Sequence, residues 1–294
     1  MTIRIDDRIS YVLTASCASR LGTVAAVSTF LAQRGCYITE MQQFDDVLTE
    51  RFFLRATFYA DPQKTPDHAA LRAQFVELAT REEMEWEIHD IRQRTRVLLM
   101  VSKLDHCLDD LLYRHRTGEL AMDITTIVSN HPDLRPLAEW HKIPFLHLPV
   151  SHATKEAQEG RLLEIVSETN SDLVVLARYM QILSDDLCRK LRGRAVNIHH
   201  SFLPGFKGAR PYHQAHARGV KLIGATAHYV TADLDEGPII EQIVERVDHT
   251  YTPEMLAAVG RDSECVALAC AVRCLIEHRV FMNGDKTVVF RGAA

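Results

Sequence analysis

The spacing of hydrophobic residues changes after about residue 90, which indicates two domains. Before that point, segments with the period of an amphipathic helix alternate with short strand-like runs. The expected order is strand, helix, strand, strand, helix, strand, over residues 9–15, 21–35, 37–44, 51–59, 66–78 and 84–91. This order is the ferredoxin-like βαββαβ pattern. We therefore predict a small domain over residues 1–90 and a larger one over 91–294.

The larger domain contains short runs that are apolar at nearly every position. Residues 96–102 and 173–176 are examples, and such runs are typical of parallel strands buried on both faces. Segments with helical spacing lie between them, so the pattern predicts an α/β fold with a Rossmann-like, mostly parallel sheet. Ligands of such sheets bind beyond the carboxyl ends of the strands. A long helix over 252–277 and a hairpin over 279–291 are expected at the end.

Composition narrows the class of protein. The 294 residues are 47% hydrophobic and 25% charged, which is typical of a soluble globular protein of two domains. The net charge of -5 and the lack of a long basic block argue against nucleic-acid binding. No signal peptide, membrane-spanning run or C-x-x-C pair is apparent, and the seven cysteines are scattered. We expect a cytoplasmic protein with reduced thiols that binds neither nucleic acid nor membranes.

The stretch at residues 195–204 carries candidate chemistry. If it begins as a strand, Val196 and Ile198 point to one face, and Asn197 and His199 point to the other. An amide and an imidazole on the same face could donate to an oxygen that gains negative charge. The same pattern would also fit a strand end with two satisfied polar residues.

A second stretch favours the chemical interpretation. His228 is followed six residues later by Asp235, in a turn that continues as Glu-Gly-Pro-Ile with Gly237. Asn-x-His followed by this turn resembles the catalytic signature of folate-dependent formyltransferases, and the resemblance extends from about residue 96 to the end. It implies that Asn197, His199 and Asp235 act on a formyl group without a metal ion.

The segment at residues 176–183 resembles the part of these enzymes that lines the folate pocket. Arg178 and Gln181 stand where the family has glycine and arginine, so individual contacts are not transferred. Core packing would explain the apolar side chains equally well. The residues expected to bind substrate are Arg178, Tyr179, Met180, Gln181, Ile182, Leu183, His228 and Gly237.

The first domain resembles an ACT domain. Gly22 and Gly35 flank its first predicted helix, and residues 51–55 form the matching strand. The resemblance implies a homo-oligomer and a small-molecule effector. The family often has an aspartate shortly before the first glycine, which is missing from residues 17–22 here. An amino-acid effector would therefore lose a partner for its ammonium group, while a role in association is unaffected.

The formyl acceptor is indicated by what the larger domain lacks. Relatives that formylate glycinamide ribonucleotide hold its phosphate with a glycine-rich loop after the first strand. Here residues 102–110 contain no glycine and include Asp105, Asp109 and Asp110. Relatives that formylate initiator tRNA carry a further C-terminal domain and a positive charge balance, neither of which this sequence shows. An ACT-like domain followed by a formyltransferase-like domain resembles the deformylases, whose formyl acceptor is water.

The implied reaction is hydrolysis of 10-formyltetrahydrofolate to formate and tetrahydrofolate. Asp235 would orient the water and take its proton, while Asn197 and His199 would bind the developing oxyanion. The folate is the substrate, and no cofactor is expected. Three alternatives are a formyltransferase for an unidentified small acceptor, a non-catalytic sensor and a metal-dependent hydrolase. The metal site would draw on His199, His200, His213, His216 and His228, with acids at Asp233 and Asp235, although no H-E-x-x-H motif occurs.

Overall fold

The chain divides into two compact units. The computed structural model describes residues 9–61, 63–205 and 211–292. The first unit extends to Arg94 and also takes Glu277–Gly284 and the residues from Val288 onward, while the second comprises Thr95–Ile276 and Asp285–Thr287. The boundary predicted after residue 90 falls just before the start of the second unit. The C-terminal segment, expected to belong to the larger domain, groups mainly with the first unit instead.

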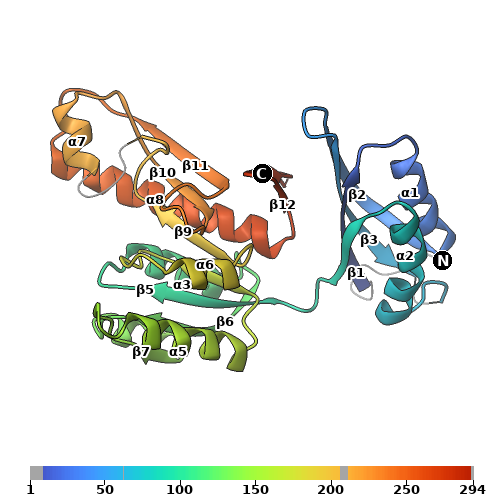
Figure 1. Ribbon diagram of the computed structural model, residues 1–294, viewed down its shortest axis with the longest axis horizontal. Coiled ribbons are helices and arrows are strands. Elements are labelled where there is room, and N and C mark those ends of the chain that lie inside the picture. The colour runs from blue at the N-terminus through green and yellow to red at the C-terminus, as the bar shows by residue number, and fades with distance from the viewer. Residues whose placement is uncertain (1–8, 62, 206–210, 293–294) are drawn as a thin grey trace. The chain divides into compact units, whose positions relative to one another are not determined.

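The first unit has the expected ferredoxin-like order. Its elements are β1 (Ile9–Ala18), α1 (Thr23–Gln33), β2 (Cys36–Asp46), β3 (Arg51–Ala60), α2 (His68–Arg81) and β4 (Glu85–Asp90). The strands form a sheet in the order β2-β3-β1-β4, and every recorded pair is antiparallel. Both helices cover the same face of this sheet (Figure 1).

Helical periodicity accounts for the core of this unit. α1 buries Val27, Phe30 and Leu31 against the sheet, and α2 buries Leu71 and Phe75. These positions repeat every three or four residues, so they share one face of each helix. The aromatic rings of Phe30 and Phe75 meet edge to face with centroids 4.9 Å apart, which joins the two helices.

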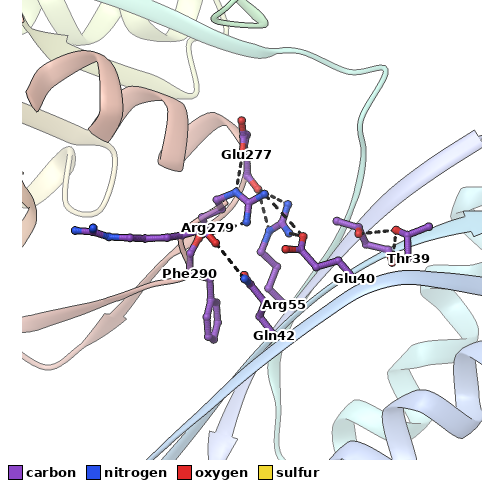
Figure 2. A network of polar contacts seen from close by, with 9 residues as sticks. Thr39, Glu40, Gln42, Arg55, Glu277, Arg279 and Phe290 are labelled. Atoms are coloured by element: carbon purple, nitrogen blue, oxygen red, sulfur yellow. Dashed lines mark hydrogen bonds and ion pairs between the residues drawn. The ribbon is translucent and has the colours of Figure 1, made fainter. Parts of the chain in front are cut away.

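The chain end covers the opposite face of the same sheet. The predicted hairpin is confirmed as β12 (Val280–Asn283) and β13 (Lys286–Val289). The Arg55 side chain, which is only 4% exposed, donates from Nε and Nη2 to the Glu277 carbonyl at 3.2 and 3.1 Å. It also donates from Nη1 to Glu40 Oε2 at 2.9 Å (Figure 2). Gln42 Nε2 donates to the carbonyl of Arg291 at 3.0 Å. The C-terminal segment is thus a structural part of the first unit.

The second unit is the predicted α/β domain. Its elements are β5 (Thr95–Val101), α3 (His106–Thr117), β6 (Met122–Ser129), α4 (Arg135–Trp140), β7 (Phe145–His147), α5 (Lys155–Glu168), β8 (Leu173–Leu176), α6 (Asp185–Lys190), β9 (Ala195–His199), α7 (Pro211–Ala217), β10 (Leu222–Tyr229), β11 (Ile239–Arg246) and α8 (Pro253–Ile276). The sheet order is β11-β10-β9-β8-β5-β6-β7, parallel from β9 to β7 and antiparallel at β10 and β11. The mostly parallel sheet is therefore confirmed.

The central strand explains the apolar runs. Residues Val97 to Val101 are fully buried, because helices cover both faces of β5. β8 and β9 lie beside it, and their register aligns Leu176 with Asn197 at their carboxyl ends. Among the described helices, including the long α8, none has the length and apolar character needed to cross a membrane. The sheet thus presents Asn197 where ligands of parallel sheets bind.

Candidate active site

Two polar side chains emerge at the end of β9. Val196 and Ile198 are buried, whereas Asn197 is only partly buried and lines a pocket, as the alternation along a strand predicts. β9 pairs with the antiparallel β10, and the register aligns Asn197 with His228 and His199 with Thr226. Residues more than 25 positions apart in the sequence therefore converge at one point of the sheet.

Asp235 completes this group from the turn before β11. Its backbone adopts the left-handed conformation with φ at 59°. Its Oδ1 atom lies 3.2 Å from His199 Nδ1 and 3.8 Å from His228 Nε2. Asn197 Nδ2 lies 3.4 Å from His228 Nε2. The three residues predicted to be catalytic are thus brought together, with His228 between Asn197 and Asp235.

Hydrogen bonding defines which ring nitrogens donate. His228 Nδ1 lies 2.9 Å from the Tyr229 carbonyl, which can only accept, so this nitrogen carries the proton. Burial lowers the pKa of His228 more than this bond raises it, which favours the neutral ring. His199 Nδ1 donates to Asp235, and within the described part of the chain the buried His199 Nε2 has no hydrogen-bond partner. Because Nδ1 donates to Asp235, Nε2 is a second donor only in the imidazolium form of His199, and in that form it is suited to bind a ligand oxygen.

The ionisation of Asp235 suits a base. Burial by itself raises the pKa of this carboxyl, but the hydrogen bond and charge of His199 outweigh burial. The pKa of Asp235 consequently lies below the ordinary value of a carboxyl. The side chain is therefore an anion at neutral pH and is available to accept a proton.

The loop after His199 is fixed by buried hydrogen bonds. The Thr226 hydroxyl donates to the Ser201 carbonyl at 2.9 Å and accepts from the Leu203 amide at 3.1 Å. Gln242 Nε2 donates to the Leu203 carbonyl at 3.1 Å. Thr226 lies directly opposite His199, so β10 holds both the catalytic strand and the loop that follows it.

These side chains line one pocket of about 880 Å³, counting the open solvent at its mouth. Met180 and Ile182 form an apolar wall and are 54% and 62% exposed. Exposed apolar side chains beside buried polar ones are typical of a ligand site. The predicted residues in its lining are Arg178, Tyr179, Met180, Gln181, Ile182, Leu183, Asn197, His199, His228 and Asp235.

Gly237 differs from the expectation. Among the described residues that line the pocket it does not appear, and its backbone packs against β10 instead. A Cβ atom at this position would lie 1.8 Å from the Tyr229 carbonyl oxygen. The glycine therefore lets the turn that carries Asp235 approach β10, and this close approach explains why the position lacks a side chain.

Several pocket residues were missed by the sequence reasoning. The segment between β10 and β11 contributes Val230, Thr231, Ala232 and Leu234, and Leu176, Cys188, Ile198 and His200 complete the lining. The first four lie between His228 and Asp235 of the catalytic signature, and this position in the sequence could have identified them as pocket residues. A buried acid within the apolar helix α8, Glu264, was a second signal that was not used.

Glu264 lies behind the pocket and organises its polar side. Its carboxylate accepts from His106 Nε2 at 2.8 Å and from the Tyr212 hydroxyl at 2.9 Å. Arg178 Nε lies 3.3 Å from the same carboxylate, and Arg178 Nη1 lies 2.6 Å from His200 Nδ1. The guanidinium of Arg178, expected to bind substrate, is thus held between two protein groups.

Of the five histidines of the metal-hydrolase alternative, three line the pocket beside Asp235 and two lie on α7, so they do not form one cluster. In the described residues, the potential ligand atoms that cluster within 4.8 Å are those of His106, Cys107 and Glu264. None of the five histidines of that alternative is among them, and His213 and His216 are exposed on α7. The Arg178 guanidinium beside Glu264 already supplies a positive charge to this cluster.

Comparison with known proteins agrees with the geometry. Residues 95–272 match the family model described as formyl transferase. A formyltetrahydrofolate deformylase of Corynebacterium sp. (strain P-1) is 52% identical, over 98% of this chain and all of that protein. The formyltetrahydrofolate deformylase of Escherichia coli K12 is 38% identical, over 95% of this chain and 97% of that protein.

Solved structures extend the comparison to the fold. A formyltetrahydrofolate deformylase of Burkholderia mallei is 59% identical, has a TM-score of 0.92 and covers 96% of this chain and all of the solved chain. Glycinamide ribonucleotide transformylase 1 of Symbiobacterium toebii is 28% identical with a TM-score of 0.63, and the match covers 67% of this chain and 95% of the solved one. The likeness to the deformylases extends over both units, and the chain belongs to the formyltetrahydrofolate deformylase family.

Proposed function

We propose that this protein hydrolyses 10-formyltetrahydrofolate to formate and tetrahydrofolate, with water as the formyl acceptor. The observation that carries the proposal is the buried His199 Nε2, which lacks a partner within the described residues. The other nitrogen of His199 is bound to Asp235, and Asn197 lines the same pocket. Donors for an oxyanion and a carboxylate base therefore occupy one site.

In this mechanism water attacks the formyl carbon while Asp235 takes up a proton from it. Asn197 Nδ2 and Nε2 of the His199 imidazolium, the form that the Asp235 carboxylate favours, donate to the carbonyl oxygen as it becomes an oxyanion. One such donor is typically worth about 3 to 4 kcal/mol. Collapse of the tetrahedral intermediate breaks the bond between carbon and N10 and returns a proton to the leaving nitrogen. Formate and tetrahydrofolate are the products, and the folate is substrate rather than cofactor.

The apolar wall supports a folate substrate. Met180, Ile182 and Leu183 lie on the segment that follows β8, at the open side of the pocket. A pteridine ring could pack against these side chains, while backbone groups read its donors and acceptors. Substrate binding by these residues is part of the proposal.

The loop after β5 supports water as the acceptor. The Ser102 hydroxyl donates to Asn130 Oδ1 at 2.7 Å and accepts from the Met180 amide at 3.1 Å, so it is used within the protein. His106, the first residue of α3, is bound to the buried Glu264. Asp105 and Asp109 lie at the same helix terminus, so a phosphate there would meet negative charge.

The direct test is to incubate the purified protein with 10-formyltetrahydrofolate alone and to measure formate and tetrahydrofolate. We expect equal amounts of both, with a rate that added glycinamide ribonucleotide does not change. Formation of formylglycinamide ribonucleotide at a rate similar to formate release would make the protein a transferase. A rate that disappears on metal chelation and returns with added metal would favour the metal-hydrolase alternative.

We also propose that the first unit mediates association into a homo-oligomer in the cytoplasm and offers a site for a small-molecule effector. All seven cysteines are free, which supports a reducing compartment. The protein without residues 1–94 and 277–294 lacks the first unit together with the three residues 285–287 of the second. In light scattering it should give a smaller number of subunits than the intact chain. The same number of subunits would contradict the association role.

A further inference from the structure

A chain of buried polar contacts leads from α8 to the pocket. Glu264 is nearly fully buried, accepts hydrogen bonds from His106 and Tyr212, and forms an ion pair with Arg178. Arg178, whose side chain is 10% exposed, adopts the left-handed backbone conformation with φ at 65°. This conformation is uncommon for a residue with a side chain, so the contacts of the guanidinium compensate for its cost.

The contact between Arg178 and His200 fixes where the proton of the imidazole lies. Arg178 Nη1 is 2.6 Å from His200 Nδ1. A guanidinium carries only donors and stays protonated, so His200 Nδ1 must accept. An imidazolium has protons on both nitrogens and cannot accept. The contact therefore requires neutral His200 with its proton on Nε2.

Aromatic rings and charged groups of both signs lie near His200. The ring of His199 stacks on it with centroids 4.9 Å apart, and Tyr212 of α7 lies 6.4 Å away. Among the described residues, Arg178 after β8 and Asp235 before β11 are charged groups near His200. The carboxylate of Asp235 attracts a positive charge, so the donation from Arg178 has to outweigh it for His200 to stay neutral. Glu264 of α8 reaches His200 only through Arg178, which balances its charge.

We propose that Arg178, held by Glu264, is a positioning residue that keeps His200 neutral in its Nε2–H form. His199 then keeps its contact with Asp235 without a second cationic imidazole stacked on it. This matters because a second imidazolium next to His199 would weaken the His199–Asp235 pair on which oxyanion binding depends. The inference rests on the proposed function and deepens it.

Nitrogen NMR of the intact protein with labelled histidine tests the tautomer without turnover. We expect His200 Nδ1 to resonate as an unprotonated nitrogen from about pH 8 down to about pH 5.5, across the usual histidine range. A proton on His200 Nδ1, or titration of His200 near its ordinary pKa of about 6.5, would overturn the proposal. Because no substrate is needed, this result is independent of whether deformylation is the correct reaction.

Kinetics test the consequence. In Arg178→Met, His200 can be protonated, so kcat/KM should fall about tenfold from its plateau by about pH 5.5, one unit below the ordinary histidine pKa. Arg178→Lys keeps a donor and should retain most of the wild-type profile. Arg178→Met combined with His200→Asn should lose the added pH dependence, because asparagine does not titrate. The profile is compared after scaling to each variant's plateau, so a smaller folded fraction does not imitate the effect. An Arg178→Met profile that matches the wild type would refute the proposal.

Discussion

Replacing Asp235 with asparagine is expected to lower kcat by at least about a hundredfold, the usual contribution of a general base. The amide preserves the shape of the side chain but cannot take up the proton of the attacking water. It also removes the negative partner of His199, whose Nδ1 atom lies 3.2 Å from Asp235. Steady-state kinetics with 10-formyltetrahydrofolate measures the effect, and calorimetric titration with tetrahydrofolate checks that binding is retained.

A matched control is available in the same turn. Asp233 is an exposed carboxylate two residues before Asp235, so Asp233→Asn changes the same net charge outside the pocket. Its kcat should remain within about twofold of the wild type, since surface substitutions have small effects. If Asp235→Asn lost no more activity than Asp233→Asn, the role of Asp235 as the base would be wrong.

The lowered pKa of Asp235 also predicts a direction for pH dependence. A carboxyl whose pKa is lower in the folded state than in the unfolded state stabilises the fold above its unfolded pKa, about 3.9. That contribution disappears as the pH falls through the folded-state pKa. In the wild-type protein, Asp235 should therefore become protonated and stop acting as a base only at a pH below the ordinary pKa of a carboxyl. The Asp235→Asn variant should lack this contribution to the pH dependence of stability.

Replacing Arg55 with methionine is expected to destabilise the first unit by about 3 kcal/mol. The substitution removes the donors that bind the Glu277 carbonyl and Glu40, in a side chain that is 4% exposed. Breaking a fully buried pair typically costs about 3 to 5 kcal/mol, and the lower end applies because Glu40 can regain water. The hairpin would lose its main polar attachment to β3.

The chain offers both a selective probe and a control for this experiment. Trp86 lies in β4 of the first unit and Trp140 in α4 of the second, and the chain has only these two tryptophans. In a Trp140→Phe background, fluorescence during urea unfolding reports the first unit alone. Arg51→Met is the control, because Arg51 begins the same strand but pairs with the mostly exposed Glu85, and should cost at most about 1 kcal/mol. Equal shifts for the two variants would contradict the structural role of Arg55.

The local pattern of residues was sufficient to predict most of the fold. Strand alternation placed Asn197 and His199 on one face of β9, and continuous apolar runs marked the central parallel strands. The turn signal at Asn283-Gly284 located the final hairpin. These features depend on periods of two or 3.6 residues, which a sequence displays directly.

By itself, the sequence determined the two fold classes and the residue types of the candidate site. The tertiary structure alone decided which distant groups meet. Arg55 and Glu277 are separated by 222 residues, so no local period could assign the C-terminal segment to the first unit. Glu264 and Arg178 likewise meet only because α8 packs behind the pocket. The tertiary structure also decided the role of Gly237, since its close approach to Tyr229 follows from strand pairing. Contacts of this kind depend on chain packing, which local composition does not encode.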